Sequence, residues 1–221
     1  MAIFQLPFIR IDIKQEEKRD VPSTLRKFLA VDAYLTNVFV NWAEQVLLLK
    51  RLKAYHKTLD ISCHSIAWLA TNLMLVWVFN NSNLYQMQVN LFIGLVLDII
   101  LVAVLKAITR RRRPTTDGSL APEKDSFPSG HAARAAFITY FFLNLWPVPL
   151  ICVPFLLAWT FAVCVSKLLM RKHHMVDIWA GIALGMFQGL LIGYMYLEQE
   201  TCARLVWWIT DEKISGAEYD V

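Results

Sequence analysis

The chain has 221 residues, of which 57% are hydrophobic and 18% carry a charge, and its mean hydropathy is +0.43. This composition is too apolar and too sparsely charged for an ordinary soluble domain, so we expect an integral membrane protein built as one compact bundle. The net charge of +4 comes mainly from cations at the ends of apolar segments, where they face lipid head groups or anionic substrates.

The first 57 residues are expected to form a tail and one amphipathic helix. Residues 1–22 mix apolar and charged positions and lack the basic start, long apolar core and cleavage site of a signal peptide. From Ser23 to Lys57 apolar side chains recur at helical spacing. The segment is too polar to span comfortably because it contains Asp32, Asn37, Asn41 and Glu44. We therefore expect it to lie in the membrane interface.

Five later stretches are apolar and long enough to cross a bilayer, namely 61–79, 89–105, 131–146, 147–165 and 176–197. The polar loop NNSNLYQMQ separates the first two, and WPVP makes a tight turn between the third and fourth. The predicted fold is all-α, a polytopic transmembrane helix bundle of about five spans with an N-terminal interfacial helix. Its predicted regions are 1–57, a transmembrane domain at 58–197 and a C-terminal tail at 198–221.

Counting crossings places the chemically rich segments on one side of the membrane. The loop 106–130, the start of the third span and the segment 166–177 all fall on the same face. The interfacial helix ends there too, with a basic run, so the positive-inside rule makes this face cytosolic. Counting residues 28–49 as a further span would instead move the N-terminus to the other side.

The segment SKLLMRKHHMVD, residues 166–177, brings histidines, cations and a carboxylate together within a short stretch of the chain. If it is helical near its end, His173 and Asp177 lie at positions i and i+4 on one face, and the carboxylate can hold one imidazole nitrogen. The other nitrogen is then available to attack. The same face continues as a glycine stripe that allows close approach of a neighbouring helix. The stripe comprises Gly181, Gly185, Gly189 and Gly193.

Several cations and the N-terminus of a helix lie on the same face of the membrane, and together they can bind a phosphoryl group. Lys106 and Arg113 are seven residues apart, two helical turns, so both can aim at one anion before Pro114 ends the helix. Lys167 adds a third cation.

The sequence PSGH, from Pro128 to His131, opens the third span. The N–H groups of a first helical turn, beginning near Ser129 and Gly130, form an anion site. His131 then lies beside the leaving-group oxygen, where it can act as a general acid.

Three motifs, taken in their order along the chain, resemble those of a known family. K-x6-RP at Lys106, PSGH at Pro128 and S-[R/K]-x5-H-x3-D at Ser166 resemble the signatures of the type 2 phosphatidic acid phosphatase superfamily, which includes lipid phosphate phosphatases. The resemblance covers roughly residues 61–197. The segments LKAITRRRRP and DSFPSGHAARAA look most like the corresponding segments in the branch of presqualene diphosphate phosphatase, which acts on polyisoprenoid diphosphates.

The resemblance implies a mechanism. His173 would attack phosphorus and become a phosphohistidine, with Asp177 orienting it, and His131 would protonate the departing oxygen. The implied phosphate-binding residues are Lys106, Arg113, Ser129, Gly130 and Lys167. The resemblance implies no metal and no cofactor, and the sequence offers no carboxylate cluster for magnesium.

One position departs from the family pattern. Lys167 stands where arginine is usual, which keeps the charge but loses the planar bidentate fork. Arg171 and Lys172 are nearby cations that could compensate.

Other readings accompany these predictions. Arg110–Arg112 are interpreted as a topology anchor that binds anionic lipid, and His174 is an alternative to His173 as the reactive imidazole. Asp98, inside an apolar span, is interpreted either as the partner of Arg134 in a structural ion pair or as a hydrogen-bonded buried acid. The four cysteines are expected to be packed free thiols.

The sequence therefore predicts a membrane phosphatase that takes phosphate from a lipid, foremost an isoprenoid diphosphate, in the endoplasmic reticulum or nuclear envelope. Two alternatives remain: a broad phosphatase for phosphatidate and sphingoid phosphates, and a catalytically weak membrane scaffold. The expected partners are the bilayer and a lipid substrate, not nucleic acid, and a homo-oligomer is compatible with the sequence.

Overall fold

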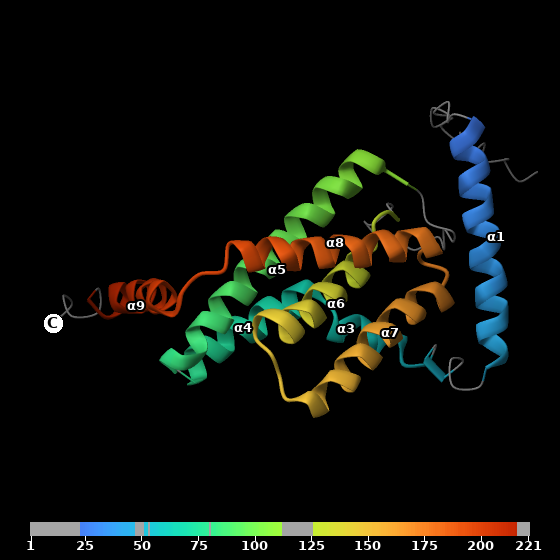
Figure 1. Ribbon diagram of the computed structural model, residues 1–221. Helices are drawn as coiled ribbons and strands as arrows, with labels where there is room; N and C mark the ends of the chain where they lie inside the picture. Colours follow the sequence, from blue (N-terminus) through green and yellow to red (C-terminus); the bar gives the residue numbers. More distant parts are fainter. Residues whose placement is uncertain (1–22, 47–50, 53, 80, 112–125, 216–221) are drawn as a thin grey trace, which may run out of the picture.

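The computed structural model describes residues 23–46, 51–52, 54–79, 81–111 and 126–215, and all regular structure in those residues is helical (Figure 1). The centre is formed by α5 (Ser82–Thr109), α6 (Gly130–Tyr140), α7 (Val153–Leu169) and α8 (Met175–Tyr194). α4 (Ser65–Phe79) packs beside α5. The predicted all-α class is confirmed for the described residues.

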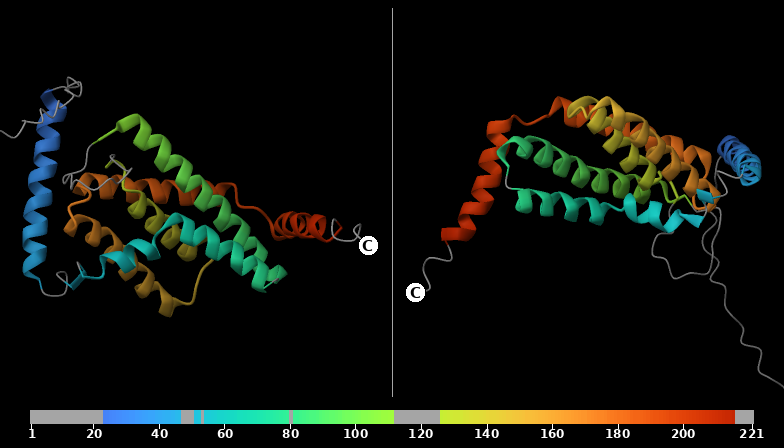
Figure 2. Two further views of the ribbon diagram at one scale, coloured as in Figure 1. Left: turned by 180° about the vertical axis from the view of Figure 1, so that it is seen from behind. Right: turned by 90° about the horizontal axis from the view of Figure 1, so that it is seen from below.

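Shorter and peripheral helices complete the bundle. α3 (His56–Ser62) precedes α4, a π-helical turn η1 (Phe141–Leu145) continues α6, and a 3₁₀ turn η2 (Leu150–Cys152) leads into α7. α1 (Ser23–Gln45) runs across one end of the bundle, whereas α9 (Gln199–Ser215) extends from the opposite end (Figures 1 and 2).

Among the described residues, fewer helices than predicted are long and apolar enough to span a membrane. Three helical segments are long and apolar enough to cross a bilayer, at Ser82–Thr109, Leu150–Leu169 and Met175–Tyr194. α3 and α4 meet the same criterion only as a pair bent by 49°, which would raise the number to four. The predicted span at 131–146 coincides with α6, which has only 11 residues before the π-helical turn begins. Five spans are therefore not confirmed for the described part of the chain.

Three predicted boundaries are wrong. The expected loop before the second span is largely helical, because Asn81 caps α5 by accepting a hydrogen bond from the N–H of Asn83 at 3.0 Å. The same helix then runs past its predicted end to Thr109, where Arg110 stops it with a φ of 44°. The expected helix from Ser23 to Lys57 ends at Gln45, and α3 is a separate helix.

The glycine stripe of α8 packs against α6, as predicted. A Cβ on Gly181 would lie 2.6 Å from the carbonyl oxygen of Ser129, and one on Gly185 would overlap the carbonyl oxygen of Ala133. No other residue type fits this close an approach between the two backbones. The start of α6 is consequently held directly against the first turns of α8.

A buried ion pair fixes α6 to α5. Arg134 Nη2 lies 2.7 Å from Asp98 Oδ2, so the predicted pairing of these two residues is confirmed. Arg134 Nη1 also donates to the carbonyl oxygen of Cys63 at 2.8 Å, which ties the junction of α3 and α4 to the same arginine. All four cysteines are free, and three of them are buried, as predicted.

Replacing Gly185 by alanine is expected to lower the free energy of unfolding by roughly 1–3 kcal/mol, because a backbone carbonyl group cannot rotate out of the way of the new Cβ. Gly193→Ala is the matched control, since its Cβ would meet only the end of the Leu145 side chain, at 3.0 Å. Thermal unfolding in detergent measures both variants. Equal unfolding midpoints would show that the approach of α6 to α8 does not depend on the stripe.

Candidate functional site

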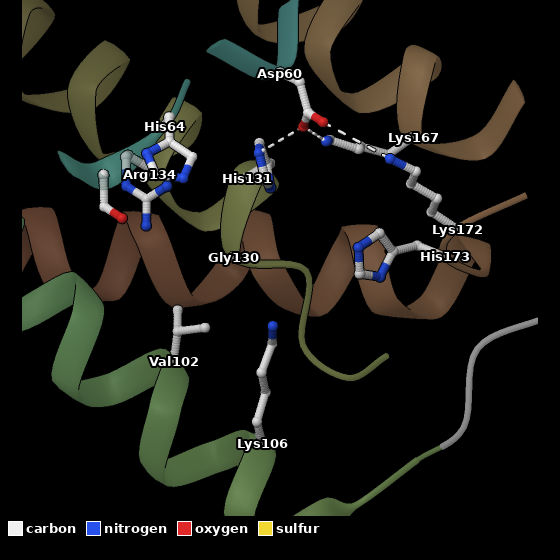
Figure 3. A pocket seen from close by; sticks show the side chains of 11 residues that line it. Asp60, His64, Val102, Lys106, Gly130, His131, Arg134, Lys167, Lys172 and His173 are labelled. Carbon is white, nitrogen blue, oxygen red and sulfur yellow. Dashed lines mark hydrogen bonds and ion pairs between the residues drawn. The ribbon is translucent and has the colours of Figure 1, made fainter. Parts of the chain in front are cut away.

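A cavity of about 170 Å³ lies near the end of the bundle that α1 crosses, and Figure 3 shows the side chains around it. They come from α3, α4, α5, α6, α7 and the loop before α8: Asp60, His64, Ser65, Val102, Lys106, Gly130, His131, Arg134, Lys167, Lys172 and His173. Three lysines, one arginine and three histidines thus face a single carboxylate. This balance of charge suits an anionic ligand.

Five of the predicted site residues meet in this cavity, namely Lys106, Gly130, His131, Lys167 and His173. Ser129 and Asp177 are buried behind the wall and do not line it. Arg113 lies outside the described residues. The argument that a helix carries Lys106 and Arg113 on one face is wrong, because α5 ends at Thr109.

His173 precedes α8, which begins at Met175, so it does not share a helical face with Asp177. Its Nδ1 lies 2.8 Å from the carbonyl oxygen of Ser126 and 3.9 Å from Asp177 Oδ2. A carbonyl oxygen only accepts, so Nδ1 carries the proton and Nε2 has the lone pair in the neutral ring. The carbonyl group of Ser126 thus holds one imidazole nitrogen of His173, which is the role that the sequence predicted for Asp177.

Asp177 is fully buried and connects three segments of the chain. Arg111 Nη1 donates to Oδ1 at 2.6 Å, while Oδ2 accepts from the Ser126 hydroxyl and, at 2.8 Å, from the backbone N–H of His174. The last contact belongs to a capping box at the start of α8. Asp177 therefore stabilises the loop that carries His173 and remains close enough to favour a charged ring.

Arg111 continues this network to α1. Its Nη2 donates to Asp32 Oδ2 at 2.6 Å. Asp32 Oδ1 also accepts from the N–H of Val176 at 3.1 Å, and Thr36 Oγ1 accepts from the N–H of Met175 at 3.0 Å. The polar residues of α1 thus cap the N-terminus of α8. The interpretation of Arg111 as a lipid anchor is wrong.

Two neighbours of His173 have other partners. Arg171 Nη1 donates to Asn37 Oδ1 at 2.6 Å on α1 and does not line the cavity, whereas Lys172 does line it. His174 forms the N-cap of α8, with its Nδ1 3.4 Å from Asp177 Oδ2, and it also does not line the cavity. The geometry therefore favours His173 over His174 as the residue that reaches a ligand.

Asp60 contacts two of the predicted site residues. One carboxylate oxygen, Oδ1, lies 2.8 Å from His131 Nε2 and forms an ion pair with Lys167 Nζ, and Oδ2 lies 3.7 Å from Lys172 Nζ (Figure 3). The Lys167 side chain is only 6% exposed. A lysine ammonium in such a place needs an anionic partner.

The start of α6 has the features of an anion site. Ser129 occupies the N-cap position without capping the helix by its side chain, and its hydroxyl has no hydrogen-bond partner among the described residues. The N–H groups of the first turn lack intrahelical acceptors and carry the positive end of the helix dipole. Gly130 brings this backbone to the cavity wall.

Comparison with known proteins identifies the family. Residues 88–200, just over half of the chain, match the PAP2 superfamily. The chain belongs to this superfamily. The match includes all the predicted site residues, and it confirms the resemblance at the level of the superfamily without addressing the isoprenoid diphosphate branch. Asp60 and α1 lie outside the matched PAP2 region.

A curated PAP2 relative is the probable lipid phosphate phosphatase beta of Arabidopsis thaliana. It is 28% identical over 128 residues, covering 44% of this chain and 60% of the relative. The match thus spans 60% of the relative's length, less than two thirds of it.

Two solved structures share the PAP2 fold at 18% identity. LpxE of Aquifex aeolicus has a TM-score of 0.54 and covers 72% of this chain and 94% of its own. The first transmembrane PAP2-type phosphatidylglycerolphosphate phosphatase of Bacillus subtilis has a TM-score of 0.55 and covers 78% of this chain and 94% of its own.

Sequence reasoning missed Asp60, Arg111 and Ser126 as parts of the site. The one available signal for Asp60 was a carboxylate immediately before an apolar stretch, in the sequence KTLDISCH. Arg111 lies in a run of four arginines. The sequence does not show which of the four side chains points into the site, because that depends on the direction of the backbone.

Asp32→Ala is expected to destabilise the protein by roughly 1.5–3 kcal/mol, because it removes a charged partner of Arg111 and an acceptor of the Val176 N–H. Asp32→Asn keeps an acceptor and should lose less. Tyr34→Phe, at an exposed position of the same helix, is the control. Unfolding midpoints in detergent compare the three variants with wild type, and a wild-type midpoint for Asp32→Ala would show that α1 does not support the site.

Proposed function

We propose that this protein is a membrane phosphatase that removes phosphate from a lipid, with polyisoprenoid diphosphates as the preferred class. The observation that carries the proposal is the meeting of His131 and His173 with Lys106 and Lys167 in one cavity, although four different segments contribute them. An activated imidazole, a second histidine and cations are the groups that phosphoryl transfer needs. Membership in the PAP2 superfamily supports the same reaction class.

In the first step, Nε2 of His173 attacks phosphorus and forms an N–P bond while the bond from phosphorus to the leaving oxygen breaks. The Ser126 carbonyl holds the Nδ1 proton, which directs the lone pair to Nε2. The positive charge that develops on the ring is stabilised by Asp177 Oδ2, 3.9 Å from Nδ1.

His131 gives a proton to the leaving oxygen and takes one from the water that later attacks the phosphohistidine. Lys106, Lys167 and the first turn of α6, from Ser129 and Gly130, neutralise the phosphoryl oxygens. Arg113 belongs to the same proposed set of phosphate-binding residues. The proposed steps use only side chains and backbone groups of the protein together with water, and they need neither a metal nor a cofactor.

The proposed preference for isoprenoid diphosphates rests on the residues of the motifs around Lys106 and His131. For the location we propose the endoplasmic reticulum or nuclear envelope. The site is proposed to lie on the cytosolic face, on the basis of the cations gathered around the cavity. The proposed partners are the bilayer and the lipid substrate.

A second candidate is a catalytically weak membrane scaffold. It is favoured by one observation, namely that the ammonium group of Lys167 already pairs with Asp60 and lacks the fork of an arginine. If purified, folded wild-type protein releases no phosphate, and Lys167→Arg releases none either, the scaffold is supported and the phosphatase proposal fails. A phosphatase with its site weakened at this position should gain activity in Lys167→Arg.

The proposal predicts that purified protein in detergent with EDTA releases phosphate from farnesyl diphosphate faster than from phosphatidate. His173→Ala should lower kcat by roughly a thousandfold or more, because a residue that acts within a catalytic unit is not replaced by its neighbours. His56→Ala, on α3 outside the cavity lining, is the matched control. Faster release from phosphatidate would favour the broad lipid phosphatase instead.

The covalent intermediate gives an independent test. After rapid quenching with alkali, wild-type protein incubated with substrate labelled in its transferred phosphoryl group should retain an acid-labile label, and His173→Ala should retain none. A label that persists in His173→Ala and disappears in His174→Ala would move the nucleophile to His174.

A further inference from the structure

Asp60 is the one carboxylate among the described residues that line the cavity, and α3, which carries it, lies outside the part of the chain that matches the family. Its Oδ1 meets both Lys167 Nζ and His131 Nε2. These are two of the groups to which the proposed function assigns phosphate binding and proton transfer. A carboxylate in this place either blocks the substrate or organises the two groups for it.

The space around Asp60 decides between these alternatives. About 170 Å³ of the cavity remains open, which is room for several waters at ~30 Å³ each and thus for one phosphoryl group. Figure 3 shows Asp60 on one side of this space, with Lys106 on the opposite side and His173 at another edge. Asp60 therefore forms part of the wall and leaves the middle of the site open.

Both contacts of Asp60 serve the chemistry. The Lys167 side chain is long and flexible, and the carboxylate fixes its ammonium group at the cavity wall, which offsets the loss of an arginine fork. His131 Nε2 is buried, so the imidazolium form needs a nearby negative charge. The other ring nitrogen, Nδ1, forms no hydrogen bond or ion pair with a described residue, and the ring lines the cavity.

We propose that Asp60 is the positioning residue of this site, holding Lys167 at the cavity wall, favouring the charged form of His131 over what burial alone would allow, and orienting its ring with Nδ1 towards the leaving oxygen. The proposal rests on the proposed function. During the first step the Nδ1 proton passes to the leaving oxygen and His131 becomes neutral, while Asp60 stays ionised. During hydrolysis the ring recovers a proton from the attacking water, and Asp60 again stabilises the charge.

Asp60→Asn should lower kcat by roughly tenfold to a thousandfold and affect KM less, with Glu200→Gln on α9 as the control. The alkaline limb of the kcat profile should move to lower pH, because the imidazolium has lost its carboxylate. The other charged or titratable groups that line the cavity are Lys106, Arg134, Lys167, Lys172, His64 and His173. Lys167 and Lys172 lose the same carboxylate partner, so a titration of His131 itself is needed to assign the shift.

Asp60→Glu keeps the charge and is the variant with less risk to folding. It should retain the wild-type alkaline limb and lose less kcat than Asp60→Asn. A higher kcat or a lower KM without loss of kcat, in either variant, would overturn the proposal, because the carboxylate would then be an obstacle to the substrate. An unchanged profile in Asp60→Asn would also overturn it.

A measurement that needs no turnover separates this proposal from the proposed function. In ¹⁵N-histidine NMR of the protein in detergent micelles, the His131 signal, assigned by its loss in His131→Gln, should titrate at lower pH in Asp60→Asn than in wild type. If wild type releases no phosphate, the proposed function fails, yet this titration still decides whether Asp60 controls His131. Equal midpoints would overturn the positioning role.

Discussion

The burial of the Asp177 carboxylate is the constraint on which the arrangement of the site depends. A fully buried charge is unstable without compensating partners, and this one receives donors from Arg111, Ser126 and the backbone of His174. These donors come from the end of α5, the approach to α6 and the start of α8. The three segments must therefore meet at one point, and that point lies beside His173.

Close helix packing then brings the second histidine to the same place. Gly181 lets the backbone of α8 approach the carbonyl oxygen of Ser129, and the N–H of Ser129 donates to the carbonyl oxygen of Asp177 at 3.0 Å. Since His131 follows two residues after Ser129, its position relative to His173 is set by backbone contacts between α6 and α8.

Sequence reasoning succeeded where the evidence was local. Helical spacing and small residues predicted the central helices and the stripe at Gly181, and a charge inside an apolar helix predicted the partner of Arg134. It failed where the contact joins distant segments, because Asp60 is 71 residues from His131 and 107 from Lys167, separations that leave no periodic signal. The predicted i and i+4 pairing of His173 with Asp177 is present as a 3.9 Å ion pair, but the shared helical face is wrong, because α8 begins only at Met175.

The position of Lys106 on α5 connects the cavity with the lipid phase. One face of this helix supplies Val102 and Lys106 to the cavity, while exposed apolar side chains follow on another face at Ile100, Val104 and Ile108. A molecule whose phosphoryl group lies among the lysines can therefore keep an apolar tail along α5 without leaving the bilayer. The lysines that line the cavity attract the phosphoryl group itself. A water-soluble phosphate ester would gain this attraction but not the contact of an apolar tail with α5, which is the physical basis of the proposed preference for a lipid.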